Sequence, residues 1–206
     1  ALLQGIKRGL FSNEAGMGSA PNAAAVASVS HPVKQGFIQT LGVFTDTLII
    51  CTSTALIILV SGAPLDGSVK GVELTQLAVT SQVGSWGGTF IAICILLFAF
   101  SSIIGNYYGE TNIQFISNKK IYLYTYRILV AIMVMLGSVV SLDIVWNFAD
   151  VSMGLMAITN LVAILLLSNI AFKAFKDYNN QKKQGLDPVF IASSIPEIAD
   201  DLECWK

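Results

Sequence analysis

The chain has 206 residues, of which 54% are hydrophobic and 12% are charged, and its formal net charge is −1. A soluble globular domain carries about 25% charged residues, so this composition excludes the soluble, disordered and disulfide-rich secreted classes. No charged residue lies between Glu73 and Glu110 or between Asp150 and Lys173. Each of these stretches exceeds the roughly 20 apolar residues with which a helix crosses a bilayer. The sequence therefore predicts an all-α integral membrane protein that has the lipid bilayer as a partner.

Residues 1–35 are predicted to form a cytoplasmic loop with one short helix. Ser19-Ala20-Pro21 has the residue types of a helix start, with Ser19 as the N-cap and proline in the first turn. The helix is expected to end before His31-Pro32, because proline disfavours the helical conformation in the residue before it. His31 is expected to be an exposed loop residue.

Four transmembrane helices are predicted within residues 36–172, at about 37–61, 86–109, 122–140 and 144–172. The short turn near residues 141–143 predicts an antiparallel hairpin of the third and fourth helices. The fourth helix is long for one span and carries Asn147 and Asp150 in its first turns. This favours a helix that is tilted, broken or partly lining a cavity. Residues 173–206 are predicted to be a cytoplasmic tail without a core of its own.

The positive charges indicate the orientation of these spans. All Lys and Arg residues except Lys70 lie on the side of the two termini, or in the case of Arg127 near enough to reach that side. Because cytoplasmic loops carry the excess of Lys and Arg, both termini are predicted to be cytoplasmic, in a multi-pass protein of the cell membrane. No basic stripe with interleaved aromatic residues occurs, so a nucleic-acid partner is not predicted.

Polar side chains within the second span form a candidate site. Ser101, Ser102 and Asn106 share one helix face with Phe98. Two hydroxyls and a backbone carbonyl near Phe98 supply the oxygen ligands that a hard cation such as Na⁺ prefers, and Asn106 can hydrogen-bond a polar substrate. The alternative is that the serines bond to carbonyls of their own helix and allow close helix packing.

Asp46 and Asp150 are acidic residues within the first and fourth spans. Ionisable groups in membrane segments are costly and usually functional, so both are candidates for gating or coupling. The alternatives are an anion favoured by the helix dipole for Asp46, and pairing with a neighbouring helix for Asp150. One loop histidine completes no catalytic set, and no metal-ligand spacing occurs, so neither enzyme activity nor a cofactor is predicted.

Several stretches of the sequence resemble one transporter family. The run GIKRGLFSNEAGMGSAPNAAA, from Gly5 to Ala25, is similar to the cytoplasmic signature of the alanine or glycine:cation symporters, the sodium:alanine symporter family. HPVKQGF, GVFTDTLIICTSTALIIL, LFAFSSIIGNYYGE and GLMAITNLVAILLLS follow in the family's order, so the resemblance covers essentially the whole chain. It implies a leucine-transporter-like five-plus-five inverted-repeat fold, of which this chain is the C-terminal portion. The missing N-terminal half of the same transporter is then a partner.

The resemblance also implies a function and a site. The function is secondary active symport of alanine or glycine with a sodium ion, with protons as an open alternative for the coupling ion. Ser101 and Ser102, with the carbonyl of Phe98, are the implied sodium-binding residues, and Ser102 and Asn106 the implied substrate-binding residues. Some family members have a tryptophan in place of Asn106 and a proline in place of Thr159, so the preferred amino acid stays open. The alternative function is a non-transporting multi-span structural or assembly protein.

Overall fold

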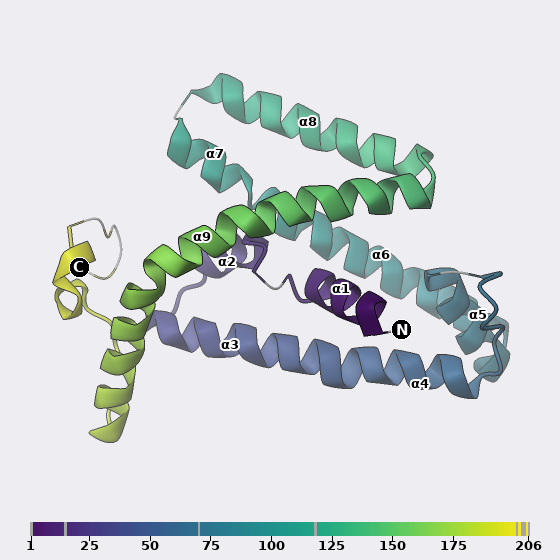
Figure 1. Cartoon of the computed structure of the whole chain (residues 1–206), viewed down its shortest axis with the longest axis horizontal. Coiled ribbons are helices and arrows are strands. Elements are labelled where there is room, and N and C mark those ends of the chain that lie inside the picture. Colours follow the sequence, from purple (N-terminus) through teal and green to yellow (C-terminus); the bar gives the residue numbers. More distant parts are fainter. Residues whose placement is uncertain are drawn as a thin grey trace. The chain divides into compact units, whose positions relative to one another are not determined.

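The computed structural model describes residues 2–14, 16–69, 71–117, 119–200, 202 and 205. All regular elements among these residues are helices, which confirms the predicted all-α class (Figure 1). The chain forms two compact units, residues 1–41 with 109–206 and residues 42–108. Lys70, on which the predicted orientation depends, lies outside the described residues, as do Cys204 and Lys206.

Among the described residues up to 31, two helices are present where the sequence predicted one. The additional helix α1 (Leu2–Ser12) contains Gly5 and Gly9, and a Cβ at either position would meet no atom within 4 Å outside the backbone of the helix itself. Helix α2 (Ser19–Ala25) begins where the sequence predicted, but Gly18 precedes it as the cap. The Ser19 hydroxyl instead donates to the Glu14 carboxylate at 2.6 Å.

Among the described residues, four helices are long and apolar enough to cross a membrane: residues 32–60, 85–116, 120–139 and 142–183. The first consists of α3 (Pro32–Phe44), the π-helical η1 (Thr45–Cys51) and α4 (Thr52–Val60), and the second of α6 (Ser85–Tyr107) and α7 (Glu110–Ile116). The third and fourth are α8 (Lys120–Val139) and α9 (Leu142–Lys183).

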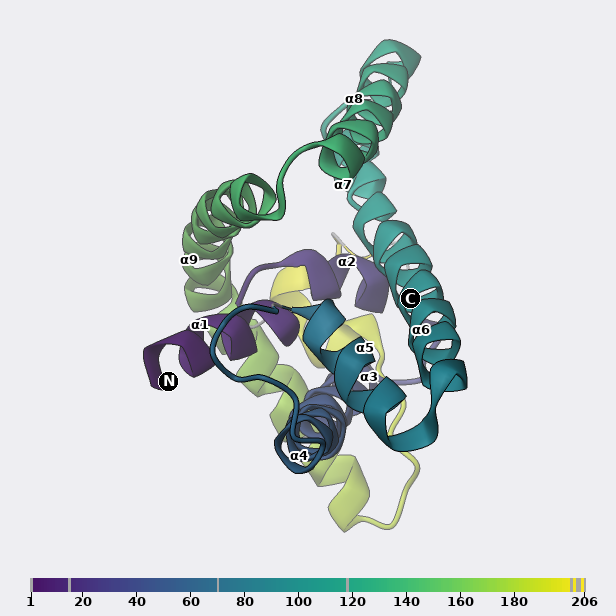
Figure 2. The same cartoon turned by 90° about the vertical axis from the view of Figure 1, so that its right-hand side faces the viewer.

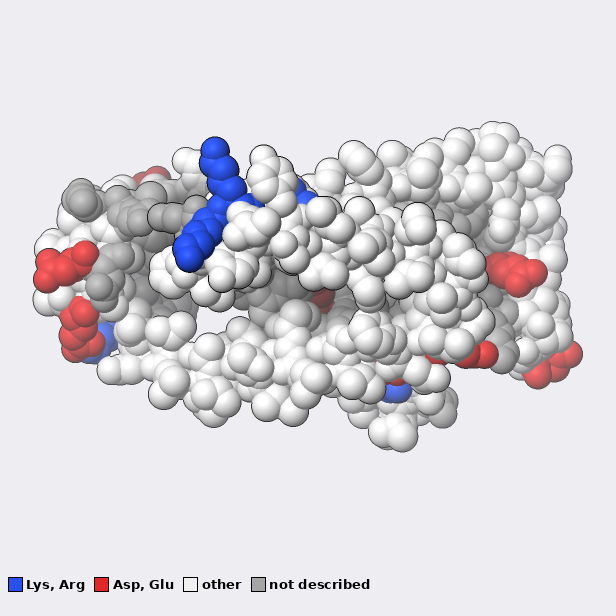
Figure 3. Space-filling model, turned by 90° about the horizontal axis from the view of Figure 1, so that it is seen from above, with Lys and Arg blue, Asp and Glu red and all other residues white. Residues whose placement is uncertain are grey.

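The apolar surfaces of these four helices are almost uncovered within the chain. The buried share of the most apolar window is 6% in the second helix and 0% in the other three. In the face that Figure 3 shows, most atoms belong to uncharged residues, and the charged residues form small separate groups. Side chains of this kind need lipid or further protein around them, as expected for membrane helices.

The unit of residues 42–108 contains a helix that the sequence did not predict, α5 (Val72–Val83), in the segment between the first two spans. Helix α5 packs against α6 and α4 (Figure 2). Gly84, with φ 81°, reverses the chain between α5 and α6. A Cβ at Gly87 would lie 2.7 Å from the Val83 side chain, so glycine allows the close approach of the two helices.

Glu110 and Arg127 join α7 to α8. Glu110 is buried, and its carboxylate accepts hydrogen bonds from Arg127 Nε at 2.9 Å and Nη2 at 2.8 Å. A bidentate pair of this kind fixes both distance and orientation. Arg127, expected to extend toward the predicted cytoplasmic side, is held by this carboxylate.

Helices α8 and α9 are joined at Ser141, as the sequence predicted, and diverge from this turn (Figure 2). The hairpin is therefore open. Helix α9 has 42 residues and is unbroken, so of the three alternatives for the fourth span a broken helix is wrong. It ends at Lys183, and beyond its cap the amide of Gly185 bonds to the carbonyl of Lys182 and that of Leu186 to the carbonyl of Gln181. This pattern is a Schellman motif, and its left-handed glycine reverses the chain.

After this reversal the C-terminal segment folds back, so the prediction of a tail without a core is wrong. We call residues 186–200, with Leu202 and Trp205, the C-terminal strap; it includes the short helices η2 (Ala192–Ser194) and η3 (Pro196–Ile198). Phe190 and Ile195 of the strap are buried with Ala174 of α9, and Val33 packs against them. His31, expected to be exposed, is fully buried beside this cluster. The strap shows no helical or strand periodicity, which is why the sequence pattern did not reveal its packing.

Candidate functional site

Helix α6 carries the residues to which the sequence assigned sodium and substrate binding. Phe98, Ser101, Ser102 and Asn106 are all exposed in the chain. The Ser101 hydroxyl donates to the Phe98 carbonyl at 2.9 Å, the bond of a serine to its own helix. Because α6 is continuous here, the Phe98 carbonyl is engaged within the helix in this structure. The binding roles of these residues stay predictions.

The face of α6 offers oxygen ligands but not a complete cation shell. Two hydroxyls and one carbonyl lie within about one helical turn. A hard cation takes further oxygen ligands, which another segment would have to provide. Among the described residues, no group of three or more His, Cys, Asp or Glu could hold a metal ion. A site on α6 would therefore be one of hydroxyl and carbonyl oxygens.

Asp46 lies in η1, a π-helical segment in the middle of the first membrane helix. Such segments are rare, disturb the regular pattern of backbone bonds and are frequent at functional sites. The sequence singled out Asp46 but did not predict the π-helix, although the clustered Thr45, Asp46 and Thr47 were a signal of unusual backbone there. The coupling role of Asp46 stays a prediction.

Asp150 joins α9 to α1. Its carboxylate lies 2.6 Å from Lys7 Nζ and 3.3 Å from Arg8 Nη1, and its side chain is 19% exposed. The sequence considered pairing of Asp150 with a neighbouring helix as an alternative to gating, and the structure has such a pairing, with α1 as the helix. Whether this contact also has a gating role stays a prediction.

Two aromatic residues surround the same contact. The Arg8 guanidinium lies 4.2 Å from the ring centre of Trp146, close enough for a cation–π interaction. Phe11 of α1 meets Trp146 edge to face, with 5.1 Å between ring centres. Sequence reasoning missed Trp146, although its position four residues before Asp150 puts both on one face of α9. We call Lys7, Arg8, Phe11, Trp146 and Asp150 the α1–α9 contact.

The turn that contains Gly16 and Gly18 also contacts α9, further along the helix. Asn160 Nδ2 donates to the Gly16 carbonyl at 3.0 Å. Gly16 and Gly18 have φ of 74° and 92°, and a Cβ at Gly18 would lie 2.9 Å from the Asn160 side chain. The turn therefore needs glycine both for its backbone conformation and for its proximity to Asn160. Two stretches that carried the family resemblance, around Gly16 and around Asn160, thus meet in the structure.

The match to a known family covers most of the chain. The sequence model of the sodium:alanine symporter family matches residues 1–192. The chain belongs to this family. The resemblance that the motifs indicated is thereby confirmed, and the α1–α9 contact and the α6 face both lie within the matched residues.

Several curated relatives are similar over nearly the whole chain. The amino-acid carrier protein AlsT of Bacillus subtilis is 59% identical over 203 residues, which are 98% of this chain and 43% of the relative. The probable sodium/glutamine symporter GlnT of Bacillus subtilis is 56% identical over 206 residues, 100% of this chain and 43% of the relative. The sodium/alanine symporter AgcS of Methanococcus maripaludis is 39% identical over 188 residues, 89% of this chain and 41% of the relative.

The chain thus spans less than half the length of these family members. No solved structure shows significant similarity to it. The predicted leucine-transporter-like repeat, the domain boundaries and the orientation in the membrane stay predictions.

Proposed function

We propose that this chain is the C-terminal part of a secondary active symporter that couples uptake of a small neutral amino acid, alanine or glycine, to the entry of sodium. The observation that carries the proposal is the family match over residues 1–192. Four helices apolar enough to cross a membrane support it. Because the chain spans less than half of its relatives, transport is proposed for the complete transporter and not for these residues alone.

Glutamine is a second candidate substrate. The relative named as a probable sodium/glutamine symporter is 56% identical to this chain, and the one named as a sodium/alanine symporter is 39% identical. The Asn106 carboxamide both donates and accepts hydrogen bonds, so it suits the amino acid backbone as well as a side-chain amide. Uptake of alanine, glycine and glutamine, each competed by the other two, distinguishes the candidates.

The proposed sodium ligands are the hydroxyls of Ser101 and Ser102 and the carbonyl of Phe98. In the resting geometry the Ser101 hydroxyl bonds to that carbonyl, and rotation of the hydroxyl would present both oxygens to an ion. Asn106, with Ser102, is proposed to contact the substrate. If sodium and substrate both favour the same state, each raises the affinity for the other, which is the coupling that a symporter needs.

The double substitution of Ser101→Ala with Ser102→Ala tests this assignment in the full-length protein in liposomes. We expect loss of sodium-stimulated uptake, because both hydroxyl ligands are removed. Ser138→Ala is the matched control, since the Ser138 hydroxyl also donates to a carbonyl three residues earlier, Met135, at 2.7 Å. Undiminished sodium stimulation in the double variant would refute the proposed ligands.

Asp150 and Asp46 are proposed to act in gating or coupling. Asp150 could control when α1 separates from α9, since its carboxylate pairs with both Lys7 and Arg8. Asp150→Asn is expected to change the rate of uptake and leave the sodium concentration for half-maximal uptake unchanged. Asp143→Asn, in the first turn of the same helix, is the control. A wild-type uptake rate in Asp150→Asn would exclude the gating role.

The proposed arrangement has four spans, with both termini on the cytoplasmic side of the cell membrane. An impermeant thiol reagent is expected to label Ser68→Cys, but not Gln184→Cys, from outside the cell. The rival function, a structural or assembly protein without transport, predicts no sodium-dependent uptake of any of the three amino acids by the correctly folded full-length protein.

A further inference from the structure

A buried histidine lies where α3, α9 and the C-terminal strap meet. His31 directly precedes α3, and its side chain is fully buried. Its ring meets Tyr178 of α9 and Phe190 of the strap edge to face, with 5.2 Å and 5.4 Å between ring centres. No membrane role proposed above uses this residue.

The hydrogen bonds of His31 assign its protonation. The backbone N–H of Val33 donates to Nδ1 at 3.2 Å, so Nδ1 carries a lone pair and the ring proton lies on Nε2. Nε2 lies 3.3 Å from the Asp177 carboxylate and donates to it. His31 is therefore a neutral N-cap of α3, with Nδ1 in the role that a serine or asparagine oxygen usually has.

The charged and titratable groups around the ring come from each element that packs against it. Asp177 and Tyr178 face it from α9, and Lys34 of α3 is near enough to act on it electrostatically. Asp187 of the strap bonds to Lys34 at 2.6 Å. Burial lowers the pKa of His31 below its ordinary value of 6.5, and Lys34 lowers it further, against the opposing effect of Asp177.

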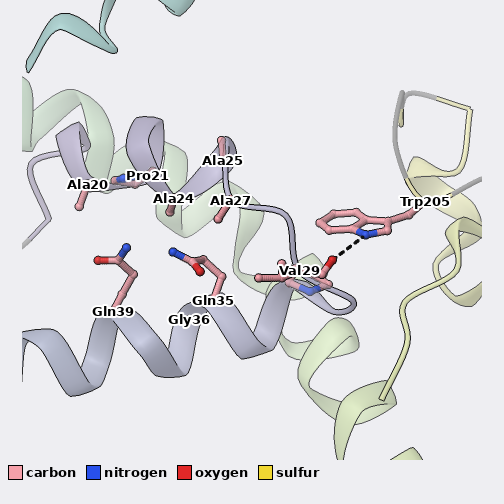
Figure 4. A pocket seen from close by; sticks show the side chains of 11 residues that line it. Ala20, Pro21, Ala24, Ala25, Ala27, Val29, Gln35, Gly36, Gln39 and Trp205 are labelled. Atoms are coloured by element: carbon pink, nitrogen blue, oxygen red, sulfur yellow. Dashed lines mark hydrogen bonds between the residues drawn. The ribbon is translucent and has the colours of Figure 1, made fainter. Parts of the chain in front are cut away.

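The strap is attached on both sides of this histidine. The Phe190 amide donates to the Ser30 carbonyl at 2.8 Å, and the Trp205 indole N–H donates to the Val29 carbonyl at 3.4 Å (Figure 4). On the α9 side, the Gln181 carboxamide donates to the Val189 carbonyl at 2.9 Å and accepts from the Val189 amide at 3.0 Å. The segment before His31 and the end of α9 are thus bound together through the strap.

We propose that His31 is a pH-sensitive contact, whose protonation releases the C-terminal strap from the start of α3 and the end of α9. The added proton occupies Nδ1, so the Val33 N–H faces another N–H and loses its acceptor. The imidazolium is also a cation at a helix N-terminus, which the helix dipole disfavours. Departure of Phe190 and the strap admits water to the ring, and water solvates both the new charge and the Val33 amide.

The sign of the effect follows from linkage. Because the pKa of His31 is lowered while the strap is bound, the released state binds more protons than the bound state. Strap attachment is therefore fully stable above about pH 6.5 and weakens as the pH falls toward the lowered value. Its effect on transport rests on the proposed function: acidification on the predicted cytoplasmic side would free the start of α3 from the end of α9 and change the uptake rate.

Hydrogen exchange of the full-length protein in detergent tests the release directly, without reference to transport. Strap peptides within residues 186–200 are followed between about pH 8 and about pH 5, after correction for intrinsic exchange rates. We expect them to lose protection on acidification, while α5 peptides, in the other unit, keep theirs. Equal protection of the strap across this range would overturn the proposal, whatever the transport assay gives.

Two variants make the assignment specific to His31. His31→Asn keeps an acceptor for the Val33 amide but does not titrate, so the pH response should disappear. Asp177→Asn retains His31 and removes the carboxylate that favours its charged form in the bound state, so the bound-state pKa falls further below that of the released state and release should move to higher pH. If His31→Asn does not fold, Asp177→Asn still tests the assignment to His31. A wild-type transition in either variant would overturn the assignment. If the wild-type protein releases the strap on acidification but shows no sodium-dependent uptake, the result counts against the proposed function alone.

Discussion

The C-terminal strap and the four membrane helices bury their apolar side chains in opposite ways. The strap makes its own core, in which Phe190 and Ile195 are 4% and 1% exposed. In the membrane helices, side chains as large as Phe98 and Leu165 are 65% and 74% exposed. The buried side chains of the strap are thus packed like those of a soluble domain, against residues of this chain. The membrane helices depend on lipid or on the rest of the transporter for their contacts.

Substitutions in the two regions should therefore have different effects on stability. A substitution in the strap should affect the attachment of the strap itself, and its effect can be interpreted from this structure alone. Changes on the membrane helices should depend on what surrounds them.

Phe190→Ala should detach the strap. Removing a buried phenylalanine ring costs about 3 kcal/mol or more, and Phe190 also contacts the rings of His31 and Trp205. Loss of hydrogen-exchange protection over residues 186–200 measures the effect. Phe172→Ala is the matched control, because Phe172 is 72% exposed on the same unit and should leave the strap protected. If both variants reduced the protection of the strap equally, the strap and the exposed membrane-helix surface would not differ in the way proposed.

Gly18→Ala should destabilise the turn between α1 and α2 by about 2 kcal/mol, because the new Cβ meets Asn160 and φ is positive. A lower melting temperature of the purified full-length protein measures this. Gly5→Ala is the control: a Cβ at that position in α1 would meet no atom within 4 Å outside the helix backbone, so alanine should be neutral or stabilising. A Gly18→Ala protein as stable as Gly5→Ala would contradict the observed turn.

Glu110→Gln should weaken the α7–α8 hairpin by about 1.5 kcal/mol, near the lower end for hydrogen bonds to charged groups, because the Arg127 side chain is 43% exposed. Faster hydrogen exchange in α7 measures the loss. Glu73→Gln, at an exposed position in the first turn of α5, should leave exchange in its own helix unchanged. If α7 of the Glu110→Gln variant exchanges as in the wild type, the Glu110–Arg127 pair does not stabilise the hairpin.

Lys34→Gln should have the smallest effect on strap attachment at neutral pH. Lys34 bonds to Asp187, but Asp187 is exposed, and ion pairs in water contribute little. Strap protection should decrease slightly in low salt and match the wild type in high salt, since salt screens such pairs. A salt-independent loss of the strap would show that Lys34 acts through packing instead.

Sequence reasoning predicted the helical class and the family, and it singled out Asp150, whose pairing with another helix was one of two alternatives. It missed Trp146, the π-helical η1 and the burial of His31. The error on His31 has a clear physical cause. Hydropathy and charge patterns describe a segment alone, whereas the surroundings of His31 come from α3, α9 and the strap together.

Composition and hydropathy are sufficient to establish that this chain is helical and suited to a membrane. Lipid offers no hydrogen bonds, so apolar segments of this length must bond their backbone internally as helices. Which distant groups meet becomes visible only in the folded chain. Asp150 bonds to Arg8 across 142 positions, Asn160 to Gly16 across 144 and His31 to Asp177 across 146. Such pairs depend on the path of the whole chain, because no local pattern specifies which two faces will come together.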